Sequence, residues 1–219
     1  MDKKGLIFGS LIFGFVLLAS IDTTAQRKVI SSNDFHRSIL QPGVKYYEKS
    51  RHVETTDETF VNGAVVSSIY TVEQVLLPNR ARFYEKEING GVIIENERIT
   101  IDFMQYTRKN NEPWVKVDMR GVAMGIGTGT GTGTLQNCEQ YTVEDSFLNG
   151  QPMQMFEWIS INANTKELRF REMRRWIGQS NLPYREETVT GNLSPREETT
   201  KRVITYEYDP AIKIEAPIK

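Results

Sequence analysis

The chain has 219 residues, and its 27 lysines and arginines almost balance 28 aspartates and glutamates, giving a formal net charge of −1. This balance argues against nucleic acid as a partner, because phosphate binding needs a concentrated basic surface. Cys138 is the only cysteine, so no internal disulfide can form and the fold must depend on its core.

Residues 1–25 are typical of a signal peptide. Lys3 and Lys4 precede an apolar segment, Leu6–Ser20, and small residues at 23–25 precede the expected cleavage point. The apolar run is shorter than the roughly 20 residues that span a bilayer. We therefore expect export and no stable transmembrane anchor after cleavage, with a retained anchor as the alternative. Residues 26–219 are long enough for one domain that buries about 70% of its extended-chain surface.

The first half of this domain predicts one short helix followed by antiparallel strands. Ser31–Leu40 has a capping residue and helical apolar spacing, and Pro42-Gly43 is expected to end the helix. Alternation from Tyr46 to Val53 indicates an exposed or edge strand. Turns are expected at Asn62-Gly63 and Asn89-Gly90-Gly91. The further strands expected here are Ala64–Leu77, Arg80–Ile88, Val92–Glu95, Arg98–Tyr106 and Trp114–Val117.

The second half begins with a glycine- and threonine-rich segment. Gly121–Thr134 has almost no bulky side chains, so it predicts a flexible loop. Within the second half, Arg174–Glu187 predicts a hairpin that turns near Gly178. The strands expected after the loop are Tyr141–Phe147, Pro152–Asn162, Glu167–Ile177, Leu182–Thr190 and Glu197–Tyr208.

Enzymatic and cofactor motifs are missing. The glycines of the segment 121–134 all occupy odd positions, so G-x-G-x-x-G cannot occur there, and the P-loop ending is absent. His36 and His52 belong to different predicted elements, and Cys138 has no activating partner in view. Carboxylate pairs such as Glu85 with Glu87 or Glu95 with Glu97 are typical of a solvated strand surface. We expect no catalytic residue, no metal site and no cofactor.

Aromatic and aliphatic residues recur on the predicted strands. A wide sheet with one helix cannot cover both faces, so it must curl, close or bury its apolar side around a ligand. An apolar cavity and an ordinary packed core both remain open. The candidates for one concave, ligand-binding face are Tyr70, Val72, Phe83, Ile101, Phe103, Phe156, Trp158, Phe170, Trp176, Ile204 and Tyr206.

Arginines concentrate near the predicted hairpin. Arg169, Arg171 and Arg175 are candidates for binding a lipid headgroup or an acidic partner, while a solvated, charge-mixed face is the alternative. Alternation is expected to place Phe170 and Trp176 toward the cavity and Arg169 and Arg171 outside.

The chain resembles the LolA-like proteins, the periplasmic carriers of outer-membrane lipoproteins. The resemblance lies in Trp176-Ile177 followed by Leu182–Arg185, in the terminal segment Tyr206–Pro217, and in the strand Ala64–Leu77 that ends in Pro78-Asn79-Arg80. It implies a mainly β fold of minor α+β character: a strongly curved, incomplete antiparallel β-barrel with a short N-terminal helix and few covering helices. It also implies an apolar interior that accepts acyl chains, and location in the periplasm or cell envelope of a bacterium.

The leading hypothesis is a non-enzymatic protein that shelters a lipid or an acylated protein in the half-barrel. The alternative is a cell-envelope scaffold that binds a protein partner through its sheet edge or its arginine-bearing hairpin.

Overall fold

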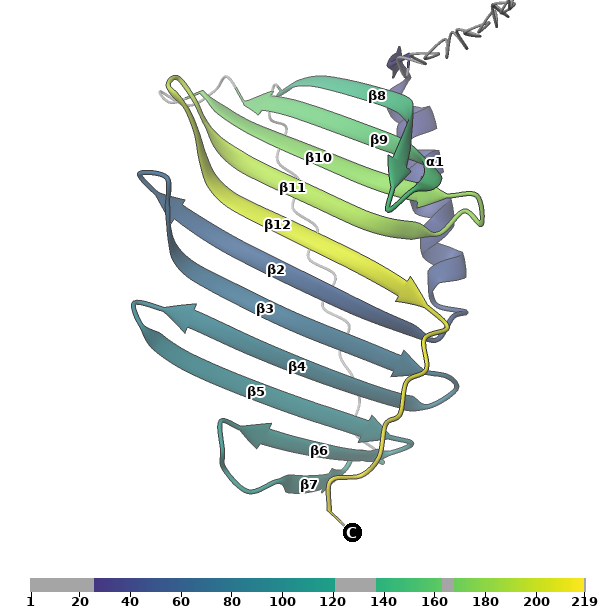
Figure 1. Cartoon of the computed structure of the whole chain (residues 1–219), viewed down its shortest axis with the longest axis vertical. Helices are drawn as coiled ribbons and strands as arrows, with labels where there is room; N and C mark the ends of the chain where they lie inside the picture. The colour runs from purple at the N-terminus through teal and green to yellow at the C-terminus, as the bar shows by residue number, and fades with distance from the viewer. Residues whose placement is uncertain (1–25, 121–136, 163–167, 219) are drawn as a thin grey trace, which may run out of the picture.

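A computed structural model describes residues 26–120, 137–162 and 168–218. Within these residues the chain forms one helix and a single sheet of twelve antiparallel strands (Figure 1). The sheet is curved and does not close, so the predicted incomplete barrel is confirmed. This is the architecture that the LolA-like resemblance implies. The predicted signal peptide and the predicted loop at 121–134 lie outside the described residues.

The sheet is built from two meanders that meet along one seam. Its spatial order is β1-β8-β9-β10-β11-β12-β2-β3-β4-β5-β6-β7, so β12 pairs with β2 and joins the second half of the chain to the first. The strands are β1 (Lys28–Val29), β2 (Arg51–Val61), β3 (Ala64–Leu76), β4 (Arg80–Asn89), β5 (Val92–Ile101), β6 (Met104–Lys109), β7 (Val115–Asp118), β8 (Asn137–Leu148), β9 (Gln151–Asn162), β10 (Arg169–Gly178), β11 (Pro183–Leu193) and β12 (Arg196–Tyr208).

Tight turns connect the strands where the sequence predicts them. Asn62 and Gly63 adopt φ of 51° and 74° between β2 and β3. Gly90 and Gly91, between β4 and β5, have φ of 55° and 84°. Positive φ at both central residues suits the two-residue hairpin turn, whose twist matches that of the strands. The hairpin at Arg174–Glu187 is also confirmed, with β10 paired to β11.

Two strand predictions in the first half are wrong. The strand predicted from Tyr46 begins at Arg51 as β2, and it lies inside the sheet between β12 and β3 rather than at an edge. The strand predicted over Arg98–Tyr106 is interrupted by a turn in which Asp102 has a φ of 54°. Phe103 therefore lies in this turn and is 63% exposed.

Helix α1 spans Ser32–Tyr46, and the Ser31 side chain caps its first turn as predicted. The predicted end at Pro42-Gly43 is wrong, because the helix continues through both residues. The Tyr46 ring packs edge to face on Tyr206 of β12, with ring centroids 5.7 Å apart. This contact with the sheet favours a longer helix than the local preferences of proline and glycine predict.

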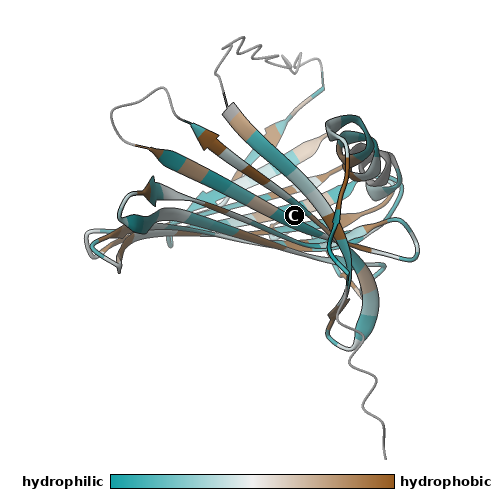
Figure 2. Ribbon diagram, turned by 90° about the horizontal axis from the view of Figure 1, so that it is seen from above, coloured by the Kyte–Doolittle hydropathy of each residue, from teal (hydrophilic) through white to brown (hydrophobic). Residues whose placement is uncertain are grey.

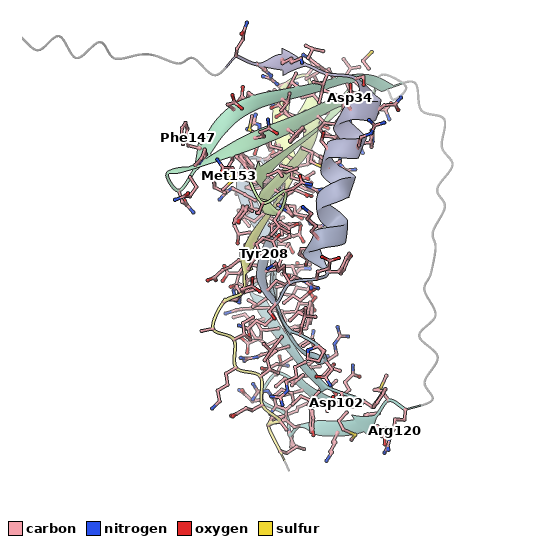
Figure 3. All side chains as sticks on the ribbon, turned by 90° about the vertical axis from the view of Figure 1, so that its right-hand side faces the viewer. Asp34, Asp102, Arg120, Phe147, Met153 and Tyr208 are labelled. Carbon is pink, nitrogen blue, oxygen red and sulfur yellow. The ribbon has the colours of Figure 1, made fainter. Side chains whose placement is uncertain are left out.

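The two faces of the sheet are covered by different segments. Figure 3 shows α1 on one side of the sheet, the C-terminal segment on the other, and the β7 end bent toward the α1 side. We call the side that contacts α1 the helix face and the other the tail face. Phe35 of α1 packs on Phe156 and Ile177 of the helix face, whereas Ile214 of the C-terminal segment packs on the tail face.

Apolar and polar residues alternate along the strands, as the hydropathy colouring in Figure 2 shows. Few strand residues are fully buried, because neither α1 nor the C-terminal segment spans a whole face. The buried apolar residues of the described chain are Phe35, Val53, Ile99, Tyr106, Phe156, Phe170, Ile177, Leu182 and Ile214. Most residues of the central strands are consequently half-buried.

Candidate functional site

The strand register divides the predicted ligand-binding residues between the two faces. Residues directly opposite one another on paired strands share a face. The row Phe156, Arg175, Glu186, Ile204 therefore runs along the helix face. Phe83, Phe156, Trp158, Ile204 and Tyr206 belong to the helix face, whereas Tyr70, Val72, Ile101, Phe170 and Trp176 belong to the tail face. The prediction that they form one face is wrong.

The arginines lie on the opposite side from the one predicted. Arg169 and Arg171 alternate with Phe170 and belong to the helix face, where the Arg171 guanidinium stands 5.4 Å from the centre of the Trp158 ring. Alternation within β10 was predicted correctly. Which of the two sides α1 covers depends on how the strands and the helix pack together, and alternation within one strand does not reveal it.

The most deeply buried described residue of helix α1 is Phe35, which is 1% exposed. Its ring lies 5.0 Å from that of Tyr141 and 6.4 Å from that of Phe156, so the three rings pack at an angle to one another. Neighbouring residues of α1 such as Asp34 and His36 are exposed. The partly buried residues around this cluster are Ile30, Ile39, Tyr141, Val143, Trp158 and Met173.

Arg175 ties the middle of α1 to the sheet. Its Nη1 donates a hydrogen bond of 3.1 Å to the Ile39 carbonyl oxygen, and its Nε donates one of 2.7 Å to the Glu186 carboxylate. These contacts occupy Arg175 within the fold. Of the three arginines predicted to bind headgroups, Arg175 is thus a structural residue.

Tyrosines surround the last turn of α1. Tyr208 contacts Tyr184 at 5.5 Å between ring centres, and its hydroxyl donates a hydrogen bond of 2.6 Å to the Pro183 carbonyl oxygen. Burial raises the pKa of Tyr206 and of Tyr208 far above the ordinary value. The Arg51 guanidinium stands 4.2 Å from the centre of the Tyr46 ring.

Two grooves flank the Phe35 cluster on the helix face. The first has a volume of about 400 Å³ and lies beside the first half of α1; it is lined by Ser38, Asp145, Pro152, Met153, Gln154, Phe156, Ile177, Gly178, Gln179 and Asn181. The second has a volume of about 590 Å³ and lies at the other ends of the strands; it is lined by Trp158, Ser160, Asn162, Arg169, Phe170, Arg171, Thr190, Gly191, Asn192 and Thr199. Both volumes are in the range of small-molecule sites.

Strand β9 connects the two grooves. Phe156 lines the first and Trp158 lines the second, and both rings project from the same face of β9 two residues apart. Phe35 packs against Phe156 between the grooves. Phe35 thus packs on the strand that contributes to both grooves.

One row of the helix face becomes polar beyond β12. Ile204 lies opposite Thr55, which is followed across the sheet by Thr71, Glu85 and Asn96. The neighbouring row contains Val53, Glu73 and Phe83, so apolar residues of this face also occur beyond α1.

The remaining chemistry of the described residues is sparse. No group of three or more histidine, cysteine or acidic residues could hold a metal ion in the part of the chain that the structure describes. His52 contacts Glu54 and Gln74, and His36 bonds within α1 to Ser32. Cys138 is exposed on β8. None of the described helices is long and apolar enough to cross a membrane.

No protein-family model and no curated protein sequence matches the chain. Among solved structures, LprF from Mycobacterium bovis is similar over 86% of this chain and 99% of its own, with a TM-score of 0.44 and 12% identity. A putative outer membrane lipoprotein-sorting protein domain from Vibrio parahaemolyticus is similar over 84% of this chain and 95% of its own, with a TM-score of 0.26 and 6% identity. Both similarities are low, so the function proposed below depends on this chain's own geometry.

Proposed function

We propose that the chain is a non-enzymatic binding protein that holds a lipid, or the acyl chain of an acylated protein, between α1 and the helix face of the sheet. The observation that carries the proposal is the way α1 is attached. Phe35 covers an apolar patch on β8, β9 and β10, and a groove opens at either end of that patch. Phe35 is the most deeply buried described residue of α1, so an apolar ligand that displaces this ring gains the patch beneath it.

The chemistry along β9 fits an amphipathic ligand. An acyl chain would pack on Phe156 and Ile177, where burial of apolar area supplies the affinity. A carboxylate or phosphate at its end would meet the exposed guanidinium of Arg171 beside Trp158. The headgroup role predicted for Arg171 is thus retained in the proposal, now on the same face as the apolar patch.

A matched pair of tryptophans tests the proposal. Trp158 and Trp176 are both half-buried and each has an arginine over its ring, Arg171 at 5.4 Å and Arg185 at 6.0 Å, but they lie on opposite faces. We expect Trp158→Ala to weaken binding of a fluorescent fatty acid roughly tenfold or more. Trp176→Ala is expected to leave the affinity within about twofold of the parent. Equal losses in both variants, or no saturable binding by the folded parent, would contradict a helix-face site.

The proposed location is the periplasm or envelope of a bacterium, after removal of residues 1–25. The support is the basic start and short apolar core of that segment. N-terminal sequencing of the exported protein tests this directly. A chain that begins near Gln26 is expected, and an intact apolar segment in the membrane fraction would indicate a retained anchor instead.

A second candidate function is a protein-interaction module that uses the sheet edge. Strand β7 is an edge strand with exposed residues throughout, and Val115 and Val117 are 57% and 42% exposed. Such an edge can accept a strand from a partner. Site-specific cross-linking from Val115 in the envelope should capture a partner if this function operates, and substitution of both valines by lysine should abolish that cross-link.

A further inference from the structure

Two neighbouring hairpin tips carry exposed aliphatic residues. Valines precede and follow the turn between β2 and β3. An isoleucine precedes the turn between β4 and β5, and a valine and an isoleucine follow it. We call this set the apolar rim; its members and exposed fractions are Val61 (53%), Val65 (50%), Val66 (46%), Ile88 (38%), Val92 (61%) and Ile93 (53%).

The two tips are adjacent in the sheet. Strands β3 and β4 pair with Ser67 opposite Asn89 and Ser68 opposite Ile88, so the end of one hairpin lies against the end of the other. Figure 1 shows both tips on the same edge of the molecule, opposite the edge occupied by α1 and the β8–β9 turn. The rim is therefore one contiguous surface, separate from the grooves.

The rim is also free of charge. Residues 59–68 and 88–94 contain no Asp, Glu, Lys or Arg, in a chain of which 25% is charged. An exposed edge of a soluble protein ordinarily carries charged residues. The absence of charge from both neighbouring tips indicates a surface that becomes buried when the protein binds its partner.

The direction of the side chains identifies what covers the rim. Val92 and Ile93 are consecutive residues of β5 in regular register with β4, so they point to opposite faces of the sheet. Val66 lies at a register shift between β2 and β3, where strict alternation does not apply. A protein that docked on one face would cover only one of Val92 and Ile93. A lipid bilayer that surrounds the tips would cover both.

We propose that the apolar rim inserts into the interfacial layer of a lipid bilayer. Insertion to this shallow depth is typical of protein segments with exposed apolar residues, and it keeps the turn backbone near polar headgroups. Because the tips lack basic residues, binding depends on apolar burial rather than on anionic lipid. The inference goes beyond ligand binding and does not depend on what the grooves hold.

The test uses residues 26–219, which contain every described element, because the apolar segment of residues 1–25 would itself bind lipid. Val65→Thr, Val66→Thr, Val92→Thr and Ile93→Thr are combined in one variant. Threonine keeps the β-branch and puts a hydroxyl in place of a valine methyl or the isoleucine ethyl group. The matched control is Val115→Thr with Val117→Thr on edge strand β7, where the valines are similarly exposed. Circular dichroism verifies that both variants are folded.

Binding is measured by co-sedimentation with phosphatidylcholine vesicles, with and without phosphatidylglycerol. We expect the parent to bind both kinds of vesicle about equally, the rim variant to bind roughly tenfold or more weakly, and the control to bind like the parent. Failure of the parent to bind, or equal binding by the rim variant, overturns the proposal. Analytical ultracentrifugation without lipid tests for self-association. A dimeric parent together with a monomeric rim variant would overturn the proposal and assign the rim to a dimer interface.

A second readout locates the inserted edge. In a Cys138→Ser background, an environment-sensitive dye is placed on Asn62→Cys at the rim, or on Asn149→Cys at the β8–β9 turn. Both positions precede a glycine and both have a φ of 51°, so the substitutions are equally strained. Vesicles should shift the emission of the dye at position 62 to the blue and leave that at position 149 unchanged. A shift only at position 149 overturns the proposal.

Discussion

Replacement of Phe35 by alanine tests whether α1 can detach from the folded sheet or is an integral part of the core. Phe35 is 1% exposed and is the deepest contact of α1 with the sheet. Truncation of a buried phenylalanine ordinarily costs about 3 to 5 kcal/mol. If α1 can detach while the sheet stays folded, Phe35→Ala lowers the free energy with which α1 docks on the sheet. The free energy of global unfolding then falls by less than the full cost of the truncation.

Hydrogen exchange and urea unfolding measure these two quantities. A docking loss of about 3 kcal/mol raises exchange of the α1 amides roughly a hundredfold, because each 1.4 kcal/mol is a factor of ten. We expect this increase over Ser32–Tyr46, with exchange in β4 to β6 unchanged and a loss in urea smaller than about 3 kcal/mol. Binding of a fluorescent fatty acid to Phe35→Ala should be tighter than to the parent, since the ring no longer competes for the patch.

Ile214→Ala provides the control. Ile214 is 2% exposed, but it packs on the tail face. This variant should lose about 2 to 5 kcal/mol of stability without any change in fatty-acid affinity. The reasoning is refuted if Phe35→Ala destabilises strands far from α1 by the full amount and binds fatty acid more weakly, because Phe35 would then be an ordinary core residue.

Three further predictions concern the sheet. Gly191→Ala should lower stability by about 1 to 3 kcal/mol in thermal unfolding, because a Cβ there meets the Glu197 backbone where the β11–β12 register shifts; a variant as stable as the parent would contradict this close approach. Glu97→Gln should cost about 1 to 3 kcal/mol in urea, since this buried carboxylate accepts hydrogen bonds from two arginines. The folded-state pKa of Tyr208 is raised, so its contribution is present below pH ~10 and is lost as pH rises further. Tyr208→Phe should make stability less dependent on alkaline pH, and an unchanged slope would exclude Tyr208 as the cause.

The strands and turns could be predicted because their signals are local. Asn-Gly and Asn-Gly-Gly supply the positive φ that tight hairpins need, and they mark the β2–β3 and β4–β5 connections correctly. The turn at Asp102 was missed because neither glycine nor proline marks it. The end of α1 was missed because Tyr46 is held by Tyr206, which lies 160 residues further along the chain.

The composition of the site could not be predicted for a different reason. Alternation fixes which residues of one strand share a face, and it correctly separated Arg171 from Phe170. It does not fix the register between strands, and a shift of one residue exchanges the faces. The sequence therefore suggested the aromatic residues of a site but not that Trp158 and Trp176 would lie on opposite sides of the sheet.

The most direct test of the helix-face site uses the three tryptophans of the chain, Trp114, Trp158 and Trp176. Trp158 lines the second groove, Trp176 lies on the tail face, and Trp114 packs in the tail-face cluster around Ile214. The protein is labelled with 5-fluorotryptophan and a long-chain fatty acid is titrated in while fluorine NMR spectra are recorded. A saturable shift confined to the Trp158 resonance is the predicted result. A shift of the Trp176 or Trp114 resonance without Trp158, or no shift at saturating fatty acid, would contradict the account.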